Sequence, residues 1–498
     1  MNIAVVGSGY VGLVSAVCFA ELGHTVVTID NDPEKIRFLQ SGGAPIHEEM
    51  LPELLARHAG RRLRFSGSVE EGIVDADVVF ICVGTPSSNN GEADLSFVDA
   101  VVRSIARTID KKILLVEKST VPVRTCDAIR RSMVLNGAPE ELFSVASNPE
   151  FLREGTAIRD FLYADRIVIG VDDEFSRDLL RGVYQPLVSG SYLSSKDRIP
   201  GKAMEAVRLI EVRARSAELI KHASNSFLAM KISFINAVAN VAEGVGADID
   251  EVCLGIGSDS RIGSKFLRPG IGYGGSCFPK DVKAFRAIAS QAGVPFELLS
   301  EVMRINSEQR TRFLEKVRKA LWTLRGKRIA VLGLAFKGGT DDLRESPAVD
   351  IIENILREGA SVCAYDPAAM DRAREELALP GLSFASDPYS AIANADALLI
   401  LTDWPEFAEL DLERVYSLLL LPIVVDGRNL YSPDAMHKAG FSYLSVGREA
   451  VWSTSPKKKQ VAAKGVVNFP SSSPKEQAKD RARSAAEHEK DTAKKLVL

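Results

Sequence analysis

The sequence of 498 residues lacks any apolar run of about 18 residues, the length that a membrane-spanning helix needs. No membrane span is therefore predicted. Residues 1–7 form a short apolar run that enters a glycine turn at once, without the charged and long apolar regions of a secretory signal. We accordingly expect a cytoplasmic protein, and a chain of this length predicts two or three domains.

Cysteine is sparse and scattered. The six cysteines include no Cys-x-x-Cys pair, which argues against a zinc site and against a disulfide framework, and no metal is expected. Four of them stand in apolar surroundings and are predicted to be core residues, while Cys126 gives no signal. Only Cys277, flanked by small, polar and charged residues, is predicted to be reactive.

The chain also lacks a strong excess of either charge, because its formal net charge is −4 at pH 7. No nucleic-acid partner is expected. Lys and Arg outnumber Asp and Glu near the end of the chain, in a segment rich in Lys, Ala, Ser and Pro. Residues 448–498 are therefore predicted to form a disordered basic tail, with a weak anionic partner as the alternative.

Glycine clusters where the first apolar run ends. The order is strand at 3–6, then Gly7-Ser8-Gly9-Tyr10-Val11-Gly12, helix at 13–22, strand at 25–29, then Asp30. In this strand-helix-strand context a Gly-x-Gly-x-x-Gly match indicates dinucleotide binding. The pyrophosphate of the dinucleotide binds the N-terminus of the helix, and the acidic residue after the second strand binds the ribose hydroxyls. NAD is predicted rather than NADP. Lys35 is either a further ribose contact or a solvated helix residue.

Alternating strand and helix patterns continue, and they predict an α/β protein with doubly wound parallel sheets. The predicted domains are an NAD-binding domain at 1–205, a central helical domain at 206–324, and a second Rossmann-like domain at 325–447 that has lost the triple glycine and binds a different nucleotide. The pattern from residue 214 to 244 predicts a long central helix, buried on several sides, that joins the domains and packs against another subunit. Residues 189–212 match neither neighbour and are expected to be an exposed insertion.

A cysteine in a glycine-rich loop is well placed to attack a substrate. Residues 272–281 read Gly-Tyr-Gly-Gly-Ser-Cys-Phe-Pro-Lys-Asp, with Asp281 four residues after Cys277. A dehydrogenase with a nucleophilic cysteine can trap an aldehyde and oxidise it again, so the pair predicts oxidation of an alcohol to an acid. Asp281 is a candidate to accept a proton through water. The alternative is a core cysteine in a structural turn.

Other polar residues stand at spacings that suit catalysis. Lys221 and Asn225 are four apart on the central helix and form a candidate oxyanion site, unless Lys221 reaches solvent. Glu150 and Glu154 follow a predicted strand, where one of them would act as a general base; a surface ion pair is the alternative. Thr120 also follows a strand, with a helix cap as its alternative role.

The chain resembles the UDP-glucose/GDP-mannose dehydrogenase family over nearly all of residues 1–447. The motifs that carry the resemblance occur in the family's order: Gly-Tyr-Val-Gly, Gly-Thr-Pro, Ser-Thr-Val-Pro, Asn-Pro-Glu-Phe-Leu-Arg-Glu-Gly, Glu-Leu-Ile-Lys-x-x-x-Asn, Ser-Arg-Ile-Gly, Gly-Gly-Ser-Cys-Phe-Pro-Lys-Asp, Phe-Lys and Arg-Glu-Ser-Pro. The resemblance implies oxidation of UDP-glucose at C6 to UDP-glucuronate by two NAD molecules, through a thiohemiacetal and a thioester on Cys277.

The resemblance also implies roles for individual residues. Lys221 and Asn225 would stabilise the C6 oxyanion, Asp281 and Thr120 would hold the catalytic water, and Glu154 or Glu150 would help deprotonate it. Further cofactor contacts would be Tyr10, Val11, Thr85, Thr120, Glu154 and Arg344. Substrate contacts would be Phe151, Leu152, Arg153, Lys221, Asn225, Arg261 (from a partner subunit), Phe266, Leu267, Arg268, Tyr273, Gly274, Lys337 and Arg428.

Three other functions remain open. The same chemistry could act on GDP-mannose or a UDP-N-acetyl-hexosamine, although Gly155, Phe278 and the Asp165-Arg-Ile-Val segment resemble the glucose branch. A two-electron hydroxy-acid dehydrogenase would not need Cys277, and a non-catalytic NAD-binding scaffold would be expected to have lost a catalytic residue. Ala164, where Pro is common, and the longer 189–212 segment depart from the family's pattern.

Overall fold

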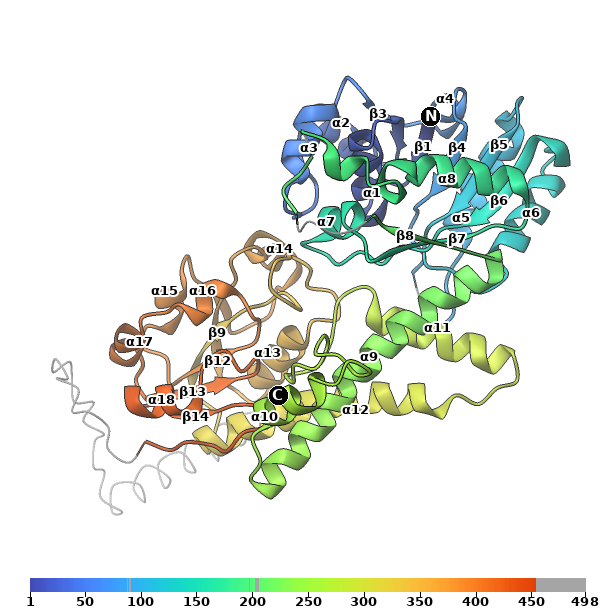
Figure 1. Cartoon of the computed structure of the whole chain (residues 1–498). Helices are drawn as coiled ribbons and strands as arrows, with labels where there is room; N and C mark the ends of the chain where they lie inside the picture. The colour runs from blue at the N-terminus through green and yellow to red at the C-terminus, as the bar shows by residue number, and fades with distance from the viewer. Residues whose placement is uncertain (87, 89–90, 197, 202–205, 454–498) are drawn as a thin grey trace, which may run out of the picture. The chain divides into compact units, whose positions relative to one another are not determined.

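The computed structural model describes residues 1–86, 88, 91–196, 198–201 and 206–453 (Figure 1). Within this part of the chain there are two open sheets, each flanked by helices, and a set of long helices between them in sequence. The predicted α/β class and the long central helix are confirmed.

The first sheet has eight strands in the order β3-β2-β1-β4-β5-β6-β7-β8. The strands are β1 (Asn2–Val6), β2 (Thr25–Ile29), β3 (Leu63–Ser66), β4 (Val78–Ile81), β5 (Ile113–Glu117), β6 (Phe143–Ser147), β7 (Arg166–Gly170) and β8 (Arg208–Val212). The helices are α1 (Tyr10–Glu21), α2 (Pro33–Gln40), α3 (Leu51–His58), α4 (Val69–Ile73), α5 (Ser96–Thr108), α6 (Thr125–Leu135), α7 (Ala157–Leu162) and α8 (Glu174–Val188), with 3-10 turns η1 (Glu140–Leu142) and η2 (Tyr192–Ser194). Ile3 and Val5 join one apolar cluster and Ala4 and Val6 another, so the sheet is buried on both faces.

Two details differ from the sequence prediction. The sheet is not wholly parallel, because β7 meets β6 antiparallel through Ser147 and Gly170, after a connection that holds only the six-residue helix α7. The segment 189–212 is not simply an exposed insertion: β8 pairs in parallel with β7 along all five residues. The first sheet therefore extends past the predicted boundary at residue 205.

The second sheet has six parallel strands in the order β11-β10-β9-β12-β13-β14. The strands are β9 (Arg328–Leu332), β10 (Ser361–Tyr365), β11 (Leu382–Phe384), β12 (Ala397–Ile400), β13 (Ile423–Asp426) and β14 (Ser442–Leu444). The helices are α13 (Pro347–Arg357), α14 (Met370–Glu376), α15 (Pro388–Ile392), α16 (Pro405–Ala408), α17 (Leu412–Leu418) and α18 (Pro433–Ala439). As the sequence predicts, Ser346 caps α13, accepting from the backbone N of Ala348, and Pro347 takes its first position.

Four helices separate the sheets in sequence: α9 (Ala214–Val245), α10 (Ile249–Gly257), α11 (Phe278–Gln291) and α12 (Glu297–Leu321). Among the described residues α9 is the one helix long and apolar enough to cross a membrane by length and composition. It nevertheless buries Glu218, Lys221 and Asn225, all of which hydrogen-bond to other segments. Such contacts are those of a helix in a protein core.

The predicted tail starts later than residue 448. Arg448 is buried and donates to Asp250, and Val451 forms an isolated bridge with Tyr443. Residues 448–453 therefore pack against the folded chain, through the side chain of Arg448 and the backbone of Val451. The rest of the tail prediction concerns residues 454–498, which lie outside the described residues.

Candidate active site

The glycine-rich turn between β1 and α1 fits a dinucleotide pyrophosphate. Gly7 has φ +100°, and a Cβ on Gly12 would lie 1.8 Å from the carbonyl oxygen of Gly7, so neither position tolerates a side chain. At Gly9, by contrast, a Cβ would meet no atom within 4 Å. Gly9 is also the N-cap of α1 and supplies no side-chain cap. The helix thus begins with uncapped backbone N–H groups beside open space, as phosphate binding requires.

Asp30 lies at the end of β2, beside this turn. The backbone N and the Oγ of Ser8 donate to its Oδ2 at 2.8 and 2.6 Å. Burial opposes ionisation, but the hydrogen bonds from Ser8 outweigh it and lower the pKa of Asp30. The Nζ of Lys35 lies 3.2 Å from the same oxygen, so Lys35 pairs with Asp30 while its side chain stays 32% exposed.

The ends of β4 and β5 bring two predicted threonines together. Thr85 Oγ1 donates to the carbonyl oxygen of Thr120 at 2.9 Å, and Lys280 Nζ donates to Thr85 Oγ1 at 3.0 Å. Thr120 is not a helix cap, since α6 begins at Thr125 with Arg124 as its N-cap. That alternative is wrong.

Lys221 and Glu150 form a buried ion pair. Lys221 Nζ lies 2.6 Å from Glu150 Oε1 and 2.7 Å from the carbonyl oxygen of the same residue. The two residues are only 4% and 6% exposed, so a lysine reaching solvent and a surface glutamate are both excluded. Burial disfavours the ammonium, but Glu150 outweighs it and raises the pKa of Lys221. Lys221 is therefore protonated and can donate to a developing oxyanion.

Asn225 and Asp281 form the second buried pair. Asn225 Nδ2 donates to Asp281 Oδ2 at 2.5 Å, joining α9 to the first turn of α11. Asp281 is 1% exposed, and its Oδ1 has no hydrogen-bond partner among the described residues; the nearest ammonium, that of Lys280, is 4.0 Å away. A buried acceptor without a partner is a place where a water molecule gains hydrogen bonds.

Cys277 is the N-cap of α11 and is partly exposed. Its Sγ lies 3.4 Å from Ser276 Oγ. Burial and the charge of Glu150 raise the pKa of the thiol to about 11, although Lys221 acts in the opposite direction. The thiol is thus protonated at neutral pH until a base removes its proton. Cys18, Cys82, Cys126 and Cys363 are buried, whereas Cys253, predicted as a core residue, is only partly so.

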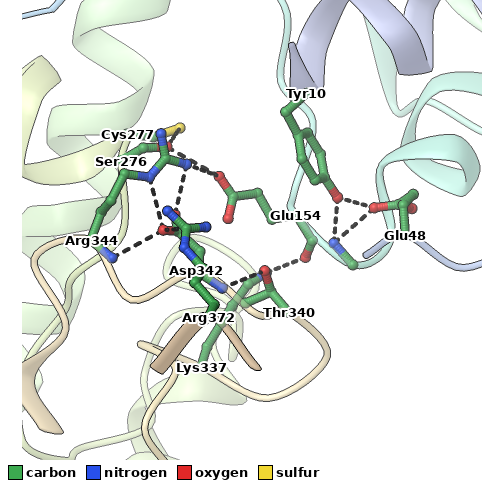
Figure 2. A network of polar contacts seen from close by, with 11 residues as sticks. Tyr10, Glu48, Glu154, Ser276, Cys277, Lys337, Thr340, Asp342, Arg344 and Arg372 are labelled. Carbon is green, nitrogen blue, oxygen red and sulfur yellow. Dashed lines mark hydrogen bonds and ion pairs between the residues drawn. The ribbon is translucent and has the colours of Figure 1, made fainter. Parts of the chain in front are cut away.

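Glu154 connects the cysteine loop with the second sheet domain (Figure 2). Its Oε1 accepts from Ser276 Oγ at 3.1 Å and from Arg344 Nη2 at 3.4 Å. Lys337 Nζ donates to its backbone oxygen at 2.7 Å. Burial, and next to it the charge of Asp342, raises the pKa of Glu154 to about 7. A carboxyl group with that pKa suits a general base near neutral pH.

Two basic residues predicted to bind the substrate lie in loops of the second sheet domain, Lys337 after β9 and Arg428 after β13. Arg428 donates from Nη2 to Phe336 O and from Nε to Leu401 O, both at 2.8 Å. Burial lowers the pKa of Arg428 and that of Lys337, because moving a cation out of water costs desolvation free energy. Arg268 is exposed, and its positive charge also lowers the pKa of Arg428.

Other predicted substrate residues have local structural roles. Leu267 is buried in the apolar cluster around Ile235 and Ile249, while the Phe266 ring centroid lies 6.1 Å from that of Phe278. A Cβ on Gly274 would lie 2.2 Å from the carbonyl oxygen of Glu345, so protein packing already requires this glycine. The backbone of Tyr273 is held by Asn306, as Tyr273 N donates to Asn306 Oδ1 at 2.8 Å and Asn306 Nδ2 donates to Tyr273 O at 3.0 Å.

The segment after Glu150 is held in the same way. Leu152 N donates to Glu150 Oε2 at 2.6 Å, and the Phe151 ring centroid lies 3.7 Å from the guanidinium of Arg166. Arg153 pairs with Asp160 at 2.6 Å and is mostly exposed.

Arg261, predicted to reach the sugar of a partner subunit, pairs with Asp259 and contacts none of Cys277, Lys221 and Asp281 in the described part of this chain. Its side chain is 87% exposed and its Nη2 lies 2.6 Å from Asp259 Oδ2.

The structure adds residues that sequence reasoning missed. Glu48 accepts from the backbone of the segment that follows Glu154, and Lys118 donates to Asn148 Oδ1 at 2.9 Å while almost fully buried. Lys118 directly follows β5, so its position at a strand end was a usable signal. Glu48 gave none, because it lies in a loop beside another glutamate, and its backbone partners Gly155 and Ile158 are more than 100 residues away.

Three consecutive regions match domains of one family. Residues 1–188 match the NAD binding domain of the UDP-glucose/GDP-mannose dehydrogenase family, residues 215–308 its central domain, and residues 330–433 its UDP binding domain. The chain belongs to the UDP-glucose/GDP-mannose dehydrogenase family. It is an oxidoreductase that uses NAD, and the predicted cofactor is confirmed.

Relatives and solved structures support the same assignment. The chain is 46% identical to a UDP-glucose 6-dehydrogenase of Rhizobium meliloti over 90% of this chain and 100% of the relative. It is 44% identical to one from Bacillus subtilis, over 92% and 95% of the two chains. A UDP-glucose dehydrogenase from Pyrobaculum islandicum has a TM-score of 0.80 at 38% identity, covering 90% and 98%. A UDP-D-ManNAc dehydrogenase from Pyrococcus horikoshii has a TM-score of 0.77 at 30% identity, covering 90% and 99%.

Proposed function

We propose that the protein oxidises UDP-glucose to UDP-glucuronate, with two NAD reduced per sugar. Relatives that are 40–46% identical carry the name UDP-glucose 6-dehydrogenase. The observation that carries the chemistry is that α11 holds Cys277 at its N-cap and Asp281 in its first turn, and that Asp281 accepts at 2.5 Å from Asn225, which lies one turn from Lys221 on α9. A two-electron dehydrogenase has no use for such a thiol.

The first oxidation converts the C6 alcohol to an aldehyde. NAD bound at the glycine turn would supply the acceptor for the hydride of C6, and the hydroxyl proton would leave through the water that Asp281 is placed to hold. Lys221, kept protonated by Glu150, donates to the C6 oxygen, and Asn225 supplies a second N–H donor from the same face of α9. Two donors that are buried and already oriented stabilise the developing charge without reorganising solvent.

The covalent steps take place on Cys277. Its Sγ adds to the aldehyde carbon, and the thiol proton ends on the new hydroxyl, giving a thiohemiacetal. Loss of a second hydride and of the hydroxyl proton leaves a thioester at the acid oxidation level. Water then adds to the thioester carbonyl, Cys277 leaves as the thiol, and the uronate carboxylate and a proton are released.

Water activation falls to the carboxylates around Cys277. Asp281 has a buried oxygen with no hydrogen-bond partner in the described part of the chain and is the candidate to hold the water. Glu154, with a pKa of about 7 and a contact to Ser276 beside the cysteine, is the candidate base. Glu150 is occupied by Lys221 and keeps that ammonium charged, which makes it the weaker candidate.

The test is stoichiometry. Purified protein is given UDP-glucose and excess NAD, NADH is measured by absorbance, and the sugar product is identified by mass. Two NADH with UDP-glucuronate is the expected result. One NADH with a released aldehyde would reject the thioester, and faster turnover of GDP-mannose or a UDP-N-acetyl-hexosamine would reject the glucose substrate.

The protein also forms a homodimer through α9 in this proposal. Phe227, Phe234 and Val241 recur every seven residues on one side of α9 and are 58%, 55% and 63% exposed. Exposed apolar side chains that gather on one side of a helix mark a protein–protein interaction site. Phe234→Glu should shift the mass measured by light scattering to that of a monomer, while Phe97→Glu, at a similarly exposed position on α5, should not. A monomeric wild-type protein would reject the dimer.

A cytoplasmic location is part of the same proposal. All six cysteines are free thiols, and free thiols persist in a reducing compartment.

A further inference from the structure

Glu48 is a buried carboxylate outside the catalytic set proposed above. It is 5% exposed and lies in the loop between α2 and α3. Its Oε2 accepts from the backbone N of Gly155 at 2.8 Å and from the hydroxyl of Tyr10. Its Oε1 accepts from the backbone N of Ile158 at 3.2 Å. One side chain thus joins the cofactor turn to the segment that follows Glu154 (Figure 2).

The position of α7 depends on this carboxylate. The side chain of Thr156, the N-cap of α7, accepts no capping hydrogen bond from the backbone N–H groups of the helix. Glu48 takes its place from a distant loop, because it accepts from the first-turn N–H of Ile158. A negative charge at a helix N-terminus is favourable, and here it also fixes where the preceding residues must lie.

Gly155 is held from both sides. Its N donates to Glu48 and, at 2.6 Å, to the hydroxyl oxygen of Tyr10. Its φ is +84°, and a Cβ there would lie 2.1 Å from the carbonyl oxygen of Gly339. Glu154, the residue before, has its backbone oxygen bound by Lys337. The peptide between Glu154 and Gly155 therefore has little freedom while Glu48 remains in place.

We propose that Glu48 is a positioning residue that sets the Glu154 carboxylate against Ser276 and Cys277. The inference rests on the proposed function, in which Glu154 activates the water that hydrolyses the thioester. The contacts argue for this role over simple fold support. Burial raises the pKa of Glu48 to about 7, so a carboxyl group is kept here against a desolvation penalty. All of its described hydrogen-bond partners are Tyr10, beside the cofactor turn, and residues of the segment 155–158 that follows Glu154.

Glu48→Gln is the sharpest perturbation. Gly155 N and Tyr10 OH donate to one oxygen of Glu48, and Ile158 N donates to the other. A glutamine side chain has one oxygen and one NH2 group, so its NH2 group would face one of these donors. The control is Glu49→Gln, since Glu49 is the adjacent residue, is about half exposed, and pairs only with Arg159 among the described residues. Glu154→Gln provides the reference for loss of the base.

The measurement is a single-turnover reaction with UDP-glucose and NAD, followed by NADH absorbance and by the mass of the intact protein. In Glu48→Gln we expect both hydride transfers to survive, the sugar thioester on Cys277 to accumulate, and kcat to fall about tenfold, because misplacing a catalytic group by about 1 Å slows a step by up to about a hundredfold. The variant should resemble Glu154→Gln in the adduct it accumulates, and Glu49→Gln should resemble the wild type.

Other outcomes overturn the inference. Equal kcat and equal adduct in Glu48→Gln and Glu49→Gln would show that Glu48 positions nothing. A fall in kcat without the adduct would assign it to fold support alone. If Glu48→Gln melts too early to assay, Tyr10→Phe, which removes a single hydroxyl from the same cluster, should accumulate the adduct to a smaller extent, and its absence there rejects the inference. A wild-type protein that makes no UDP-glucuronate would instead reject the proposed function.

Discussion

Replacing Lys221 with Met tests the buried ion pair and the oxyanion role together. The substitution keeps the length of the side chain and removes the ammonium that lies 2.6 Å from Glu150 Oε1. Breaking a buried pair from one side is destabilising by about 3–5 kcal/mol, because the remaining charge is left in a poorly solvated place. For a domain of this size each kcal/mol lowers Tm by about 2–4 °C, so the unfolding midpoint of the NAD-binding region should fall by roughly 6–20 °C.

Adding Glu150→Gln to Lys221→Met separates the effect of the unpaired carboxylate from the effect of altered side-chain packing. The double variant has no unpaired carboxylate, so it should be more stable than Lys221→Met alone, with a coupling of about 0.5–3 kcal/mol. Lys231→Met on the same helix is the control, since Lys231 Nζ donates to the backbone oxygens of Ile262 and Gly263 and pairs with no carboxylate among the described residues. Thermal and urea unfolding measure stability.

The sign of the pH dependence follows from the pKa shift. Burial opposes ionisation of Glu150, but Lys221 outweighs it and lowers the pKa of the carboxyl group. Its stabilising contribution is therefore present above the usual Glu range and is lost as pH falls through the lowered pKa. Without Lys221, burial dominates and the pKa rises, so the loss of stability should be larger at pH 8 than at pH 5.

The same variant should lose catalysis of the first step. Removing one donor of an oxyanion site lowers kcat by about 10²–10³-fold, and stopped-flow NADH formation isolates the first hydride transfer. A Lys221→Met protein that melts within 2 °C of wild type and turns over within about threefold of it would refute both the ion pair and the oxyanion role.

Three further outcomes are expected. Cys277→Ser should abolish net turnover while NAD affinity, measured by fluorescence titration, stays unchanged; full activity would remove the covalent mechanism. Asp30→Ala should weaken NAD binding by about 10–100-fold, since a hydrogen bond to a charged group contributes about 1.5–3 kcal/mol. Glu34→Ala, at an exposed position nearby, is its control, and equal affinities would reject the ribose role. Thioester hydrolysis should accelerate as pH rises through about 7, where the raised pKa of Glu154 leaves its carboxyl group ionised, and a flat profile in single-turnover experiments would exclude it as the base.

Local sequence was sufficient for the parts of the site that one segment builds. The glycine turn and Asp30 belong to a single strand-helix-strand unit, in which spacing determines geometry. Lys221 and Asn225 share a helix face because they are four residues apart, and each was found buried with a carboxylate partner. In such cases the local pattern contains the structural information.

The sequence alone did not predict the features that depend on packing between distant segments. Leu267 stands in a motif that resembles substrate-binding residues, yet its side chain is in an apolar cluster of the central helices. Gly274 suggested close approach to a ligand, but the backbone of Glu345 already excludes a Cβ there. The strand β8 was missed because its pairing with β7 joins segments about 40 residues apart. No local pattern records which distant segment will fill a space.

The two catalytic donors and the unpartnered oxygen together suggest how one site can serve both oxidation and hydrolysis. Lys221 and Asn225 each already contact a carboxylate, so their charge and orientation are set before a substrate arrives. Asp281 accepts from Asn225 at Oδ2, whereas its Oδ1 has no partner among the residues that the structure describes, although an unsatisfied buried acceptor costs about 1–3 kcal/mol. A water bound at Oδ1 would offset that cost and would lie beside the residue that orients the oxyanion. Because Asp281 is then occupied in holding the water, the proton must pass to another carboxylate, and among the described neighbours of the Cys277 loop Glu154 has the pKa that suits this role.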